Sequence, residues 1–151
     1  KTAYEIPKRD WSSDVCSSDL LIYIIHQMGL LHTLTQTMAS KLLTKQNLRK
    51  IYKLCISLPP FNEYYMPQPH KIQFSVINTN EVMGYFHTEP MRIEIDRMCD
   101  SFLKVFETMM HECIHVYLYK ANHSDYDQHN EKFKRLAKRI CDMYNFDYKE
   151  F

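Results

Sequence analysis

Apolar residues between positions 38 and 58 recur at approximately helical spacing, and basic residues fall mostly on the other side. The apolar positions are Leu42, Leu43, Ile51, Leu54, Cys55 and Leu58. This pattern predicts a long helix that packs one face against a core. Pro59 and Pro60 are expected to end the helix, and the Pro-rich stretch 59–69 is predicted to be a loop within a domain rather than a linker between domains.

Apolar and polar residues alternate in short runs after this loop. The run 71–77 places Ile72, Phe74 and Val76 on one face, and the run 91–96 does the same with Met91, Ile93 and Ile95. The run 81–87 has a similar β-like composition. Alternation with a period of two predicts strands, and we expect the three strands to form a meander.

The helical period returns after position 100. Asp100 or Ser101 is predicted to cap a helix that runs to about Lys120, and the turn-like residues 121–127 follow it. A final helix is predicted over 130–144, with these side chains inward: Phe133, Leu136, Ile140 and Met143. The order of elements predicts one α+β domain over residues 38–151, with an N-terminal packing helix, a small three-stranded sheet and two further helices.

Composition places the chain among ordinary globular proteins, because 45% of its 151 residues are hydrophobic and 25% are charged. The formal net charge of +1 neither favours nor excludes nucleic acid as a partner. Five Cys without paired spacing predict reduced thiols and a cytoplasmic location, with Cys55, Cys99 and Cys141 as small buried side chains. The apolar run 20–25 is too short for a signal core or a membrane span, so no membrane attachment is expected.

The first twenty residues resemble translated DNA rather than a natural protein segment. The run DWSSDVCSSDL, residues 10–20, is what the adapter ligated to sequencing libraries encodes in one reading frame, and KTAYE matches the outer end of that adapter. We therefore interpret Lys1–Leu20 as an artefact and exclude it from the fold. Residues 21–37 are of uncertain origin, with a non-native leader as one interpretation, and Met28 and Met38 are the candidate initiators.

The motif HECIH, residues 111–115, lies on the helix predicted to end near Lys120. Positions four apart share one face of a helix, so His111 and His115 can direct two imidazole nitrogens at one metal ion. Glu112 lies beside that face and can reach a metal-bound water as a general base. Zinc suits two imidazoles, and the motif therefore predicts a catalytic zinc site.

A catalytic zinc site needs a third protein ligand. Leu118 and Ala121 stand where a metzincin has its glycine and third histidine, which excludes that class. Glu131 is the acid nearest to the position that a thermolysin-type site uses, but it lies closer in sequence than that class prefers. His129 and His123 are the histidine candidates, and these considerations leave the choice open.

The stretch FETMMHECIHVYLYK, followed by DQHNEKFKRLAKRI, resembles the SprT-like (Spartan-type) zinc metallopeptidases, with similarity over roughly residues 72–140. The positions that match the family pattern are Thr108, His111, Glu112, His115, His129 and Phe133. The resemblance implies a zincin-like fold, with zinc held by His111, His115 and His129 and with Glu112 as the catalytic residue. Asn130 replaces the usual glycine, Cys113 replaces Met or Leu, and the CxxC pairs of the zinc ribbon in longer members are absent from this sequence.

Two classes of function follow. The first is a zinc-dependent endopeptidase that hydrolyses protein substrates, including DNA-associated proteins, through a zinc-activated water with Glu112 as general base. The alternative is a non-catalytic, zinc-stabilised module that binds DNA or protein. Glu112 favours the enzyme, because a purely structural site has no use for a base.

Three further expectations concern substrate and partners. The run 81–87 is predicted to hold an extended substrate by main-chain pairing, with Gly84 either permitting close approach or marking a bulge. Tyr117 and Tyr119 are candidates for stabilising the oxyanion. Five basic residues of the last helix could contact DNA phosphates, although a solvated face is the commoner explanation: Lys132, Lys134, Arg135, Lys138 and Arg139.

Overall fold

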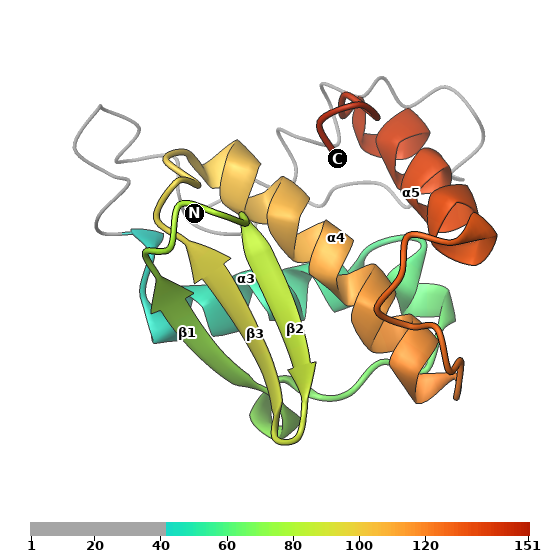
Figure 1. The fold of residues 1–151 in the computed structure, drawn as a ribbon, viewed down its shortest axis with the longest axis horizontal. Helices are drawn as coiled ribbons and strands as arrows, with labels where there is room; N and C mark the ends of the chain where they lie inside the picture. The colour runs from blue at the N-terminus through green and yellow to red at the C-terminus, as the bar shows by residue number, and fades with distance from the viewer. Residues whose placement is uncertain (1–41) are drawn as a thin grey trace, which may run out of the picture. The chain divides into compact units, whose positions relative to one another are not determined.

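Three α-helices and one three-stranded sheet make up residues 42–151, the part of the chain that this computed structural model describes (Figure 1). In chain order the α-helices and strands are α3 (Lys45–Ser57), β1 (Gln73–Ile77), β2 (Gly84–Thr88), β3 (Met91–Asp96), α4 (Phe102–Lys120) and α5 (Glu131–Tyr144). Two short 3-10 helices, η2 (Phe61–Glu63) and η3 (Pro69–Lys71), lie between α3 and β1. The predicted α+β class is thereby confirmed. The interpretations of Lys1–Leu20 and of residues 21–37 lie outside the described residues.

Helix α3 begins at Lys45, because the Thr44 hydroxyl caps it by accepting a hydrogen bond from the Asn47 N–H at 3.2 Å. It ends at Ser57, before the two prolines, as predicted. The Pro-rich loop packs on this helix, since the buried Tyr52 hydroxyl donates to the Pro67 carbonyl at 2.9 Å. The loop is therefore part of the domain, as its composition indicated.

The strand order is β1-β3-β2, and the predicted meander is wrong. Strands β2 and β3 form an antiparallel pair, whereas β1 runs parallel to β3. The chain between β1 and β2 therefore crosses the end of β3 instead of turning back beside β1. Asp96 at the end of β3 holds this connection, because its carboxylate accepts hydrogen bonds from the backbone N–H of Thr79 at 2.7 Å and of Asn80 at 3.3 Å.

Asp96 is fully buried and still ionised. Burial raises its pKa, but the N–H groups of Met98, Thr79 and Asn80 outweigh burial and leave the pKa below its ordinary value. The fixed connection also sets the start of β2, because the Asp96 N–H donates to the Met83 carbonyl at 2.8 Å.

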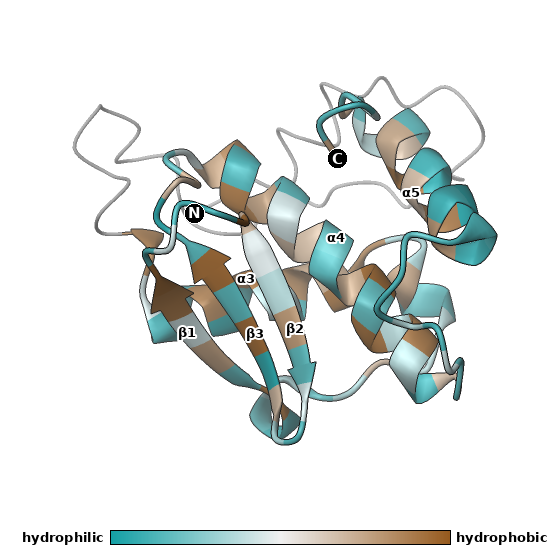
Figure 2. Ribbon diagram, in the orientation of Figure 1, coloured by the Kyte–Doolittle hydropathy of each residue, from teal (hydrophilic) through white to brown (hydrophobic). Residues whose placement is uncertain are grey.

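One face of the sheet forms the core with the helices. Phe74, Ile93 and Phe86 lie opposite one another across the three strands, and all three are buried. Helix α3 packs on β1, and α4 packs on β2, on β3 and on α3. Figure 2 shows the apolar residues that alternate along the strands.

The other face of the sheet carries polar side chains. The Glu94 carboxylate accepts from the Ser75 hydroxyl at 3.0 Å and lies 3.0 Å from the His87 ring. His87 is thus a strand residue with a carboxylate partner.

Both later helices carry side-chain caps. Ser101, rather than Asp100, caps α4 by accepting from the Lys104 N–H at 3.2 Å. Asn130 caps α5 by accepting from the N–H groups of Lys132 and Phe133 at 2.9 and 3.0 Å. The asparagine that replaces the usual glycine therefore has a structural role.

The buried face of α5 differs in part from the prediction. Phe133 and Ile140 are buried as expected, but the other buried positions are Ala137 and Cys141, while Leu136 and Met143 are only half-buried. Helix α5 packs against α4, and small side chains at this contact let the two helices approach closely. The buried face therefore keeps Phe133 and Ile140 and includes Ala137 and Cys141 in place of Leu136 and Met143.

The cysteines of the described segment are free and buried, as predicted for Cys55, Cys99 and Cys141. Within residues 42–151, no helix has the length and apolar character needed to cross a membrane.

Candidate metal centre

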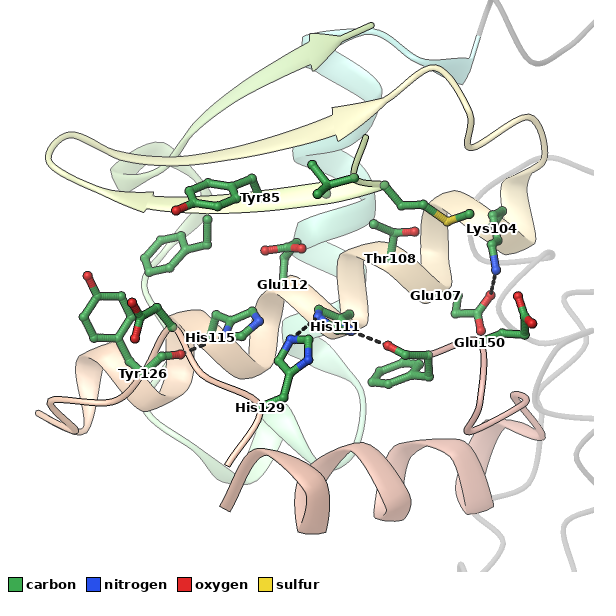
Figure 3. A pocket seen from close by; sticks show the side chains of 16 residues that line it. Tyr85, Lys104, Glu107, Thr108, His111, Glu112, His115, Tyr126, His129 and Glu150 are labelled. Carbon is green, nitrogen blue, oxygen red and sulfur yellow. Dashed lines mark hydrogen bonds and ion pairs between the residues drawn. The ribbon is translucent and has the colours of Figure 1, made fainter. Parts of the chain in front are cut away.

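The structure brings His111 and His115 of α4 together with His129, which precedes α5 (Figure 3). Their candidate ligand nitrogens all lie within 4.8 Å of one another, and the Nε2 atoms of His111 and His129 are 3.1 Å apart. Tetrahedral zinc with bonds of about 2.0 to 2.1 Å would separate two ligand nitrogens by about 3.3 Å. The three imidazoles are therefore close enough together to hold one metal ion.

Phe133 provides the apolar support for the three rings. Its ring stacks on His129 with centroids 4.2 Å apart, and it lies 4.8 Å from the His111 ring and 4.7 Å from the His115 ring. Because Asn130 starts α5 immediately after His129, the first turn of that helix places both Phe133 and the third histidine against α4.

Main-chain oxygens orient the two histidines of α4. The His115 Nδ1 lies 2.7 Å from the Tyr126 carbonyl oxygen, and the His111 Nδ1 lies 2.5 Å from the main-chain oxygen of Phe151. Each of these oxygens accepts, so each Nδ1 carries the proton and each Nε2 presents its lone pair. This arrangement is typical of metal-binding histidines.

The three histidines are also held neutral. Burial, followed by the proximity of His115 and His129, lowers the pKa of His111 to about 3. Burial likewise lowers the pKa values of His115 and His129. Only a neutral imidazole binds a metal ion, so all three side chains are in the required state at neutral pH.

Glu112 lies beside this cluster and points toward β2 (Figure 3). The residue is only 3% exposed, and burial raises the pKa of its carboxyl group to about 8. Its Oε2 atom has no hydrogen-bond partner within the described part of the chain. A buried acceptor without a partner is costly, and this one is available to a ligand in the cavity.

Gly84 allows β2 to lie close to Glu112. The residue stands opposite Ile95 on the covered face of the sheet, in a regular antiparallel register, so it does not mark a bulge. A Cβ atom at this position would lie 2.7 Å from Glu112 Oε1 and 2.7 Å from Thr108 Cγ2. Close approach is therefore the reason for a glycine here.

A cavity of about 390 Å³ opens between β2 and the cluster. It is lined by the three histidines and Glu112 together with Val82, Met83, Gly84, Tyr85, Phe86, Lys104, Glu107, Thr108, Tyr126, Asp127, Glu150 and Phe151. Several of these residues belong to no sequence motif, and nothing in the sequence indicated that they would line the site. The proposed oxyanion candidates do not line it: Tyr117 stacks on Tyr64 with centroids 4.3 Å apart, and Tyr119 packs against Tyr126 at 5.1 Å.

The other candidates for the third ligand lie outside the cluster. The Lys132 ammonium donates a hydrogen bond to His123 Nδ1 at 2.9 Å, and the Glu131 carboxylate forms an ion pair with Lys134 at 3.1 Å. Of the three candidates that the sequence left open, the structure brings only His129 to the two histidines of α4.

The basic residues of α5 are partly neutralised. Lys134 pairs with Glu131 on the same helix, and Arg139 lies 3.2 Å from Glu63 of the Pro-rich loop. Lys138 lies 3.3 Å from Asp142. Contact with DNA stays a prediction.

Comparison with known proteins gives one match. The model of the SprT-like family matches residues 58–150, which is more than half of the chain. The matched segment includes the sheet, α4, α5, the three histidines and Glu112. No curated protein and no solved structure matches the chain significantly.

Proposed function

The chain belongs to the SprT-like family, and from this we propose that it is a zinc-dependent endopeptidase in which Glu112 acts as the general base. One observation carries the proposal. The unpartnered, buried carboxylate oxygen of Glu112 lies beside three convergent neutral imidazoles in an open cavity. A purely structural zinc site would use a fourth protein ligand and would leave no buried base beside an open position.

Each residue has a distinct role in this proposal. His111, His115 and His129 would hold the zinc ion, which when bound supplies a Lewis acid for the scissile carbonyl and lowers the pKa of water. Glu112 would take the proton of the attacking water and deliver it to the leaving amine. The raised pKa of Glu112 agrees with such a role, since a group that must both accept and release a proton works best near the operating pH.

The substrate would bind along β2. This strand is at the edge of the sheet, and residues Val82 to Phe86 line the cavity beside Glu112. An edge strand offers free N–H and C=O groups, so an extended peptide can pair with it and present its backbone to the base. Main-chain recognition of this kind favours a protein or peptide in extended conformation.

We extend the proposal to DNA-associated proteins as substrates. The support is the family membership and the basic residues of α5, of which Lys134, Lys138 and Arg139 already have acidic partners. Cleavage should therefore be compared with and without single- and double-stranded DNA.

The proposal is tested by casein cleavage with the full chain. Zinc-loaded protein should cleave casein, protein treated with a chelator should not, and added zinc should restore cleavage. If zinc binds at one site per chain and no protein is cleaved, with or without DNA, the chain is instead a zinc-stabilised binding module.

A further inference from the structure

The chain folds back onto the metal centre after α5. Asn145 takes a left-handed conformation, with φ 57° and ψ 42°, and the Phe146 N–H donates to the Cys141 carbonyl at 3.1 Å. Asp147 then closes a tight turn, because its carbonyl oxygen accepts from the N–H groups of Glu150 and Phe151, each at 3.0 Å. We refer to residues 145–151 as the C-terminal turn.

Aromatic rings anchor this turn to α4. The Phe151 ring stacks on Phe146 with centroids 6.0 Å apart, and Phe146 meets Phe106 of α4 edge-on, also at 6.0 Å. The Phe151 ring lies 5.4 Å from the His111 ring. The stack fixes Phe151 beside the first histidine of the cluster.

The backbone of Phe151 makes the polar contact with His111. Its main-chain oxygen is 2.5 Å from His111 Nδ1, on the side of the ring opposite to the Nε2 atom that faces His129. Tyr126, in the connection between α4 and α5, makes the equivalent contact to His115. The C-terminal turn therefore provides a main-chain acceptor for His111, and the connection between α4 and α5 provides one for His115.

We propose that the C-terminal turn is a positioning element of the metal centre, in which the main-chain oxygen of Phe151 fixes the tautomer and ring orientation of His111. The proposal rests on the metal site of the proposed function and does not depend on hydrolysis. Phe151 is a positioning residue, because it acts on the metal through His111. Loss of such an outer partner typically weakens metal binding by about 10- to 100-fold.

The test is the zinc dissociation constant of the full chain and its variants, measured by competition with a chromophoric chelator. A chain that ends at Lys149 loses the main-chain oxygen of Phe151 together with Glu150 and should bind zinc about 10- to 100-fold more weakly. Phe151→Ala loses the ring that holds this oxygen and should show a smaller loss, about tenfold. The Phe151→Tyr variant keeps the ring and the main-chain oxygen and should restore wild-type affinity.

Tyr148→Ala is the matched control, because Tyr148 is in the same turn, is 48% exposed and does not line the cavity. It should bind zinc as the wild type does. Circular dichroism of each metal-free variant identifies a temperature at which all variants are folded, and zinc binding is measured at that temperature. The visible absorption of bound Co²⁺ should change only in the variants that lose the contact between Phe151 and His111.

The possible failures are distinguishable. If the chain ending at Lys149 is folded and binds zinc as tightly as the wild type, the inference is wrong and the proposed function is unaffected. If the wild type binds no zinc, the proposed function fails and the inference fails with it. A selective loss of zinc affinity in a chain that cleaves nothing would support the positioning role alone.

Discussion

At the scale of single residues, the candidate site depends on side chains kept neutral by burial. Burial lowers the pKa of His111 to about 3 and raises that of Glu112 to about 8. Both shifts favour the uncharged form before metal binds. The two groups should therefore change the stability of the metal-free protein in opposite directions as the pH rises.

The pH dependence of stability should identify Glu112. Its pKa rises from about 4.3 in the unfolded chain to about 8 in the folded chain. Because the folded value is higher, the stabilisation is complete below about pH 4 and is lost as the pH rises toward 8, by at most about 1.4 kcal/mol per pH unit. Glu112→Gln is uncharged at every pH and should lose less stability over this range.

Urea unfolding of metal-free protein, from pH 5 to pH 8.5 with a chelator present, measures this difference. The depressed pKa of His111 has the opposite effect, since its contribution is present above about pH 6.5 and is lost as the pH falls toward 3. That loss is common to both proteins and cancels in the comparison. Parallel stability curves for wild type and Glu112→Gln would contradict the buried, neutral carboxyl.

Sequence could predict the residues of the cluster but not their supports. The HECIH spacing places His111 and His115 on one face of any helix, whatever surrounds it. The oxygens that orient them belong to the main chain of Tyr126 and Phe151, and every residue of a chain carries a main-chain oxygen whatever its side chain. Only the fold determines which main-chain oxygen reaches a given imidazole.

At the scale of elements, sequence predicted the helices and strands but not how the strands pair. Alternation identifies a strand and its buried face, and Phe74, Ile93 and Phe86 do face the core. Alternation does not identify a partner, since β1 shows the same pattern in a meander as in the observed order β1-β3-β2. The crossing depends on Asp96, whose bonds to Thr79 and Asn80 join residues far apart in sequence.

The contact of β2 with α4 should be sensitive to Gly84→Ala. A Cβ atom there would meet Glu112 Oε1 and Thr108 Cγ2 at 2.7 Å, so either the base or the strand must shift. We expect a loss of about 1–3 kcal/mol in stability and a marked loss of hydrolysis at unchanged zinc content.

Thr88→Ala, at the other end of β2, is the control for this experiment. It should leave both zinc content and hydrolysis near wild type. Wild-type stability and activity in Gly84→Ala would show that the close approach is unimportant.

The start of α5 should depend on the cap. Asn130→Ala removes the acceptor for the N–H groups of Lys132 and Phe133 and should cost about 1 kcal/mol, whereas Asn130→Gly should cost only a few tenths. Thermal unfolding of both variants measures the difference. Equal losses would mean that Asn130 matters for another contact, such as its bond to the Asp125 carbonyl.

At the scale of the described domain, the cluster joins α4 to the residue that precedes α5. His111 and His115 belong to α4, and His129 enters from the start of α5. An ion bound by all three should therefore stabilise the folded state as a whole, because the unfolded chain has no preformed site.

Zinc should raise the free energy of unfolding by about 4 kcal/mol when free zinc exceeds its dissociation constant a thousandfold. His115→Ala and His129→Ala should lose most of this gain, while His123→Ala should keep it, since His123 contacts Lys132 instead of the cluster. Unfolding with and without zinc tests the ligand set. If His123→Ala loses the gain and His129→Ala keeps it, the assigned third ligand is wrong.

The most direct test of the central claim compares casein hydrolysis by wild type and Glu112→Gln at equal zinc content. Gln keeps the size of the side chain and removes the base without removing a ligand. We expect equal zinc binding and a fall in kcat/KM of about 10²-fold or more. Equal hydrolysis by the two proteins, or no hydrolysis by zinc-loaded wild type, would contradict it.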